Sequence, residues 1–159
     1  MFKKIFIAAM IMIFSLSAVQ AQIEKMSVCS GLQFVLKELI AGREQTTLKG
    51  KVNRDDATLY DCKMIFAGWQ GVGISEPKAG FTITFYSSGD DEKSLRELFE
   101  QAKKDILGCA LTDVGQTLTI DKPGQIEFTI SSVTVMMVLL PKTATYPADL
   151  AMRITKKLD

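Results

Sequence analysis

The densest group of reactive side chains in the sequence is the acidic run Asp90-Asp91-Glu92. Three adjacent carboxylates supply the oxygen ligands that hard cations prefer, but the ligand spacing of an EF-hand loop is absent. Acidic residues directly before an apolar helical pattern also cap free backbone N–H groups and suit the helix dipole. We therefore predict a helix start at this run and no metal site.

A second acidic group, Asp55 and Asp56 with Asp61, could supply a carboxylate pair for acid–base catalysis. Adjacent residues in a turn point in different directions, so a solvated hairpin turn is the favoured interpretation. The sequence contains no histidine, which excludes serine–histidine and cysteine–histidine nucleophiles as well as histidine-containing zinc sites. We predict no catalytic residue and no cofactor. A small hydrolase that uses carboxylates or a thiol is the alternative.

The three cysteines, Cys29, Cys62 and Cys109, lie too far apart for a CxxC redox or zinc motif. In an oxidising compartment they allow one disulfide and leave one thiol over. The sequence does not identify the pair, and three buried, inert thiols are the alternative. Because Cys62 alternates in phase with Met64, we expect its thiol to face the core and to be unreactive.

Methionines could form a soft-metal site or an adaptable binding surface, since Met64, Met136 and Met137 lie among apolar neighbours. All three fall in segments with the pattern of strands, whose alternate side chains face a core. We therefore expect core packing.

The only tryptophan lies in a glycine-rich segment from Gly68 to Lys78. The order of the glycines is not GxGxxG, and a strand rather than a helix follows, which excludes a dinucleotide cradle. Glycine lets a backbone approach a ligand closely, and an indole offers a large apolar face with one N–H donor. The predicted ligand-binding residues are Gly68, Trp69, Gln70, Gly71, Gly73 and Tyr86. The alternative is a twisted hairpin connection in which Trp69 turns inward and closes one end of the core.

Residues 1–21 have the pattern of a cleavable signal peptide. Two lysines precede an apolar run from Ile5 to Leu16, and small residues lead to a cleavage site after Ala21. The run is shorter than the roughly 20 residues of a membrane span. We expect removal of this segment to leave residues 22–159 as one domain, periplasmic or secreted, with no stable membrane anchor.

The charge balance argues against nucleic acid as a partner. The whole chain has a formal charge of +1, and loss of the two signal-peptide lysines changes it to −1. Phosphate binding needs clustered basic residues, and the longest cluster, Arg153 with Lys156 and Lys157, lies at the C-terminus, where cations suit a helix end.

Apolar spacing along the chain predicts three helices and six strands. The helices are expected at residues 28–40, 95–107 and 148–157, with Gly42 and Gly108 after the first two. The strands are expected at residues 46–52, 58–66, 81–86, 116–120, 125–130 and 133–140. The last of these strands is apolar on both faces, which is typical of a central strand.

Tight turns between most strands favour an α+β fold, an antiparallel sheet of about six strands with two main helices on one face and a short C-terminal helix. A helix followed by three strands occurs twice in this order. The order resembles the α+β scaffold of the type III secretion chaperones, which implies a sheet that binds partner segments and a dimer. Those chaperones are typically acidic and cytoplasmic, whereas this chain is near neutral and has a signal-peptide pattern.

The favoured function is an exported, small binding or protein-interaction module, whose partner is a protein or a small molecule in the cell envelope. A homo-oligomeric structural subunit is a further alternative, because six short strands present sheet edges that need covering. A homodimer would satisfy the same need.

Overall fold

The computed structural model describes residues 24–52, 59–76, 80–109 and 116–157. The predicted signal peptide, 1–21, and the predicted turn at Asp55 and Asp56 lie outside these ranges. Within them, no helix combines the length and the apolar character that a bilayer span requires.

Both predicted main helices are confirmed, as α2 (Val28–Ile40) and α4 (Glu92–Gly108). The Ser27 hydroxyl accepts a hydrogen bond from the backbone N–H of Ser30 and caps α2, and the Asp91 carboxylate caps α4 in the same way. After α2 the chain turns at Gly42, whose φ of 70° suits glycine. A short helix, α3 (Glu44–Thr47), follows.

The described residues form ten strands, most of them in one large sheet. Their bounds are β1 (Glu24–Met26), β2 (Lys49–Val52), β3 (Leu59–Cys62), β4 (Met64–Phe66), β5 (Gly71–Ser75), β6 (Gly80–Gly89), β7 (Gln116–Lys122), β8 (Gln125–Ile130), β9 (Val133–Leu140) and β10 (Ala148–Lys157). Eight strands pair antiparallel in the order β2-β3-β5-β6-β10-β9-β8-β7, while β1 and β4 form a separate parallel pair.

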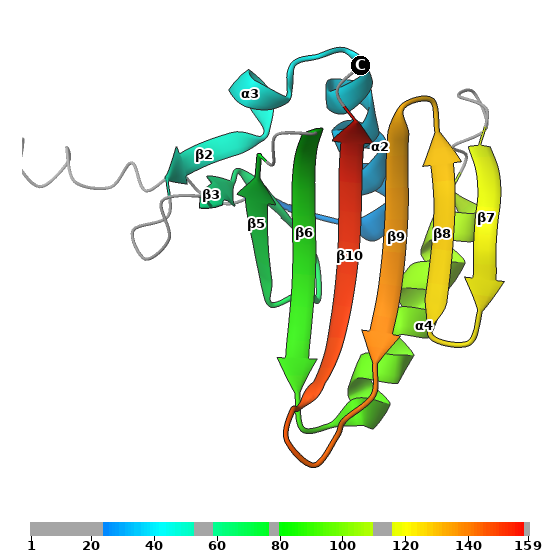
Figure 1. Cartoon of the computed structure of the whole chain (residues 1–159). Coiled ribbons are helices and arrows are strands. Elements are labelled where there is room, and N and C mark those ends of the chain that lie inside the picture. The colour runs from blue at the N-terminus through cyan, green and yellow to red at the C-terminus, as the bar shows by residue number, and fades with distance from the viewer. Residues whose placement is uncertain (1–23, 53–58, 77–79, 110–115, 158–159) are drawn as a thin grey trace, which may run out of the picture.

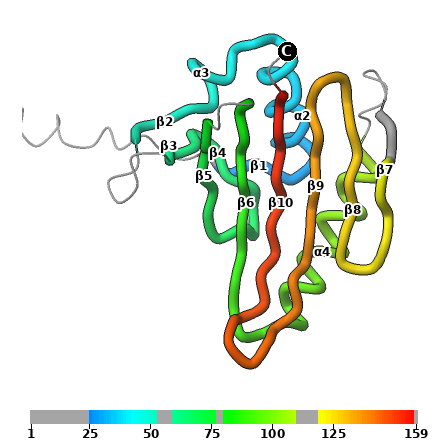
Figure 2. Tube along the Cα trace, viewed as in Figure 1, coloured from blue at the N-terminus to red at the C-terminus, as the bar shows by residue number. Residues whose placement is uncertain are grey.

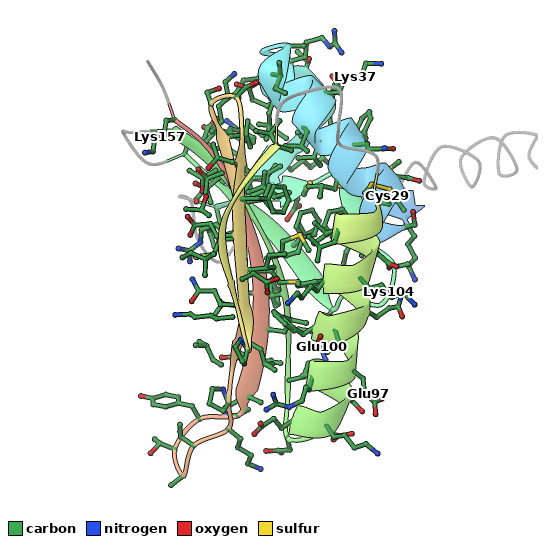
Figure 3. The ribbon with its side chains drawn as sticks, turned by 90° about the vertical axis from the view of Figure 1, so that its right-hand side faces the viewer. Cys29, Lys37, Glu97, Glu100, Lys104 and Lys157 are labelled. Carbon is green, nitrogen blue, oxygen red and sulfur yellow. A yellow bond between two sulfur atoms is a disulfide. The ribbon has the colours of Figure 1, made fainter. Side chains whose placement is uncertain are left out.

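The α+β class is therefore confirmed, and the sheet is larger than expected. Each half of the chain supplies a main helix and then four strands of the large sheet, and the last strands of the two halves, β6 and β10, meet at its centre (Figure 2). Both main helices lie behind the sheet in Figure 1 and on the same side of it in the edge-on view of Figure 3. No described helix covers the other face, which we call the outer face.

The core lies between the sheet and the two helices. Along β6, β8, β9 and β10 every second side chain points towards the helices and is buried, as strand alternation requires. Phe66 and Phe85 stack at the centre, with ring centroids 3.9 Å apart. Complete burial of one such side chain stabilises a fold by roughly 1.5–3 kcal/mol.

The predicted C-terminal helix is wrong, because residues 148–157 form the strand β10 in the middle of the sheet. Leu150 and Ile154 fit helical spacing, but they also fit the period of two of a strand. Pairing with β6 on one side and with β9 on the other favours the strand. The C-terminal basic cluster is thereby divided. Arg153 and Lys157 lie on the outer face, while Lys156 points inward and its Nζ lies 3.1 Å from Oε1 of the buried Glu44.

Three other segments differ from the sequence-based expectation. The strand predicted at 58–66 is two strands, β3 and β4, which belong to different sheets and separate at Lys63. The glycine-rich segment contains the unpredicted strand β5, and the first residues of the strand predicted at 46–52 belong to α3. The element order that resembled the type III secretion chaperones is therefore not the order of this chain.

Candidate functional site

The structure separates the six predicted ligand-binding residues into a buried part and an exposed part. Gly68, with a φ of 86°, turns the chain out of β4. Trp69 then points into the core, with 6% of its surface exposed and its indole edge-on to both Phe66 and Phe85. The structure therefore has the inward orientation that the sequence left as the alternative for Trp69, in which its side chain closes one end of the core. Ligand binding by the six residues stays a prediction.

Gln70 fastens the start of β5 to the end of β6. Its backbone N–H donates to the carbonyl of Tyr86 and to the hydroxyl of Ser87. Its side-chain amide donates to the carbonyl of Ser88 at 3.0 Å and accepts from the N–H of Ser88 at 2.9 Å. The amide of Gln70 therefore continues the sheet ladder, and this gives the residue a structural role.

The remaining predicted residues, Gly71, Gly73 and Tyr86, lie on the outer face. Gly71 and Tyr86 are cross-strand partners, and a Cβ at position 71 would lie 2.2 Å from Cζ of the tyrosine ring. Only glycine lets the ring lie flat against β5 in this way. Tyr86 nevertheless keeps 49% of its surface exposed. The glycine therefore positions an exposed aromatic ring on an open sheet.

Cross-strand register shows which side chains share the outer face with Tyr86. One row of partners crosses the sheet through Gly71, Tyr86, Ala151, Val138 and Gln125. The next row contains Gly73, Thr84, Arg153, Met136 and Glu127. A third row contains Ser75, Thr82, Thr155, Thr134 and Thr129.

An apolar strip follows β9 across these rows. Met136, Val138 and Leu140 all point to the outer face, because the residues between them are buried on the helix side. Leu140 is 53% exposed. A sheet face that meets water normally carries polar residues at such positions. Ala151 and Tyr86, on the neighbouring strands β10 and β6, broaden the strip.

Two opposite charges flank this strip. Arg153 on β10 and Glu127 on β8 are both register partners of Met136 on β9. Their Cα atoms are therefore about 10 Å apart, two strand spacings. Within the described residues neither charge forms an ion pair.

The acidic run 90–92 is fully engaged within the chain. Asp91 caps α4, Oδ1 of Asp90 lies 2.7 Å from Nζ of Lys142, and Oε1 of Glu92 lies 2.7 Å from a guanidinium nitrogen of Arg96. These contacts hold the pKa of all three carboxyl groups below their usual values. The predicted helix start is confirmed, and each carboxylate has a structural partner.

Cys29 and Cys109 form a disulfide between the start of α2 and the end of α4, with their Cα atoms 5.6 Å apart. Cys62 keeps its thiol and is 2% exposed, which confirms its predicted place in the core. Burial raises the pKa of the Cys62 thiol, so the nucleophilic thiolate is disfavoured. The described residues thus bring no base to a reactive thiol.

Sequence reasoning missed the outer-face strip but contained a signal for it. The segment 133–140 is apolar on both faces, which we interpreted as typical of a central strand. β9 does lie inside the sheet, yet only one of its faces has a described helix against it. Ala151 and Arg153 were missed because their segment was assigned to a helix.

The chain matches no protein-family model, and no curated protein or solved structure is significantly similar to it.

Proposed function

We propose that this protein is an exported protein-interaction module that binds another polypeptide through the outer face of its sheet. The observation that carries the proposal is the apolar strip of Met136, Val138 and Leu140 on a face that no described helix covers. Burial of such apolar area against a partner lowers the free energy of the complex by roughly 25 cal/mol per Å².

The residue types around the strip support a protein partner. Tyrosine, methionine and arginine are enriched in the cores of protein interfaces, and Tyr86, Met136 and Arg153 lie in two adjacent rows of the face. Small molecules are usually bound in concave sites that enclose most of their surface. The outer face is instead open along neighbouring strands, which suits another extended surface.

Export is supported by two independent features. The signal-peptide pattern of residues 1–21 directs a chain out of the cytoplasm. The disulfide between Cys29 and Cys109 requires an oxidising compartment in which to persist. The periplasm or the secreted fraction meets both conditions.

Site-specific photo-crosslinking in the producing cells tests the proposal. A photo-reactive amino acid in place of Val138 should give a cross-linked product that contains a second polypeptide. The matched control is Lys104, which is exposed on α4 on the helix side of the fold (Figure 3). Equal cross-linking from both positions, or none from Val138, would contradict an interaction through the outer face.

A further inference from the structure

We infer that the polypeptide bound by the outer face is a second copy of this chain, packed face to face about a two-fold axis parallel to β9. This inference rests on the proposed function, since it names the partner of the same surface. It also commits to a geometry, because the axis determines which residues of the two copies meet.

The symmetry operation has a simple effect on the sheet. A two-fold axis that runs along β9 between the two sheets leaves each residue row at its own height and exchanges the strands on either side of β9. β10 of one copy then lies over β8 of the other, β6 lies over β7, and β9 lies over β9. Sheet twist rotates the two sheets by about 30° from this ideal alignment.

The charges of the outer face are self-complementary under this operation. Arg153 on β10 faces Glu127 on β8 of the second copy, because both lie in the row of Met136. The reciprocal pair forms on the other side of the axis. Two residues that have no ion-pair partner in the described part of one copy therefore acquire one in the dimer, in two symmetric contacts.

The uncharged residues are compatible with the same axis. Met136, Val138 and Leu140 lie on the axis and contact their own counterparts, which buries the apolar strip. The row of Thr155, Thr134 and Thr129 meets a row of threonines. Tyr86 on β6 faces Lys122 on β7 of the second copy, since both belong to the row of Val138. An ammonium group over a tyrosine ring is attractive.

The available area is sufficient for a dimer. The face from β6 to β7 is five strands wide, about 24 Å, and the length of β9 is about 27 Å. The two copies would together bury about 1,300 Å², within the range of about 1,200–2,000 Å² that stable interfaces bury.

Charge reversal tests the inference. Light scattering of the purified protein, from expression of the full chain, should give the mass of a dimer. Arg153→Glu and Glu127→Arg each place like charges together in both symmetric contacts, so each should raise the dimer Kd more than tenfold. The double variant Arg153→Glu/Glu127→Arg restores opposite charges and should restore the dimer. Lys104→Glu, on the helix side, should leave the dimer unchanged.

The double variant also guards against misfolding, because a protein that one substitution has unfolded is not rescued by a second charge reversal. A wild-type protein that is monomeric at about 100 μM would overturn the inference, since a micromolar Kd gives a dimer there. So would a dimer that both single variants leave intact. If the wild type is monomeric and Val138 cross-links to a different polypeptide, the proposed interaction through the outer face stands and only the inference of a second copy is overturned. If Val138 gives no cross-link, both the proposed function and the inference are overturned.

Discussion

Removal of the disulfide should lower the free energy of unfolding by several kcal/mol. Cys29 and Cys109 are 80 residues apart in sequence, and the bond keeps them together in the unfolded chain. The loop-closure relation gives a loss of about 4.5 kcal/mol for a loop of this length. Single domains are stable by only about 5–15 kcal/mol, so the bond supplies a large share of the total.

The structure indicates that the fold should survive this loss. The bond joins the first turn of α2 to the residue after α4, and both helices also contribute buried side chains to the core against the sheet. The double variant Cys29→Ser/Cys109→Ser should therefore unfold cooperatively, at a lower denaturant concentration than the wild type.

Urea denaturation followed by circular dichroism measures the difference. Oxidised wild type should exceed the double-serine variant by about 3–5 kcal/mol. Reductant should remove most of this advantage and leave the variant unchanged, which provides the control. A loss below about 1 kcal/mol, or a wild type whose stability does not change with reductant, would refute the loop-closure reasoning, because removal of a native disulfide from a small secreted domain typically costs about 2–5 kcal/mol.

Three further predictions concern the interior. Trp69→Ala should destabilise the protein by about 3–5 kcal/mol in chemical denaturation, against under about 1 kcal/mol for Tyr86→Ala, and equal losses would contradict the inward indole. Cys62 should resist alkylation in the native, oxidised protein and react as a single thiol in urea; fast native reaction would place it at the surface. Hydrogen bonds from Arg43 lower the pKa of Glu38, so their stabilisation is present above the ordinary value of 4.5 and is lost as the pH falls through the lowered pKa. Arg43→Met should therefore unfold with a weaker acid dependence than the wild type, and identical dependences would exclude the pair as the cause.

The sequence predicted correctly those elements whose buried residues fit only one period, either that of a helix or that of a strand. The three- and four-residue spacing of α2 and α4 has no competing interpretation, so both helices, and the start of α4 at the acidic run 90–92, follow from the sequence. β10 was misassigned because Leu150 and Ile154 satisfy both periods, and the deciding fact is that β6 and β9 flank it. β5 was not predicted because its glycines interrupt the alternation of apolar and polar side chains that marks a strand.

Most features of the candidate site, like β10, could not be predicted because they depend on contacts between elements far apart in the sequence. The direction in which Trp69 points depends on its contacts with Phe66 on β4 and Phe85 on β6, two strands that no local pattern brings together. The disulfide pair depends on the packing of α2 beside α4. The outer-face strip required knowledge that both helices lie on one side of the sheet, which leaves Met136 outside and Met137 inside.

The adjacent pair Met136 and Met137 allows the most direct test of the outer face as a binding surface. Met137 is fully buried on the helix side, whereas Met136 lies on the outer face. Oxidative footprinting in the producing cells should leave both residues protected, while the dilute, purified Arg153→Glu variant should oxidise at Met136 and remain protected at Met137. Equal oxidation of Met136 in the two settings would contradict the central claim that another polypeptide covers this face.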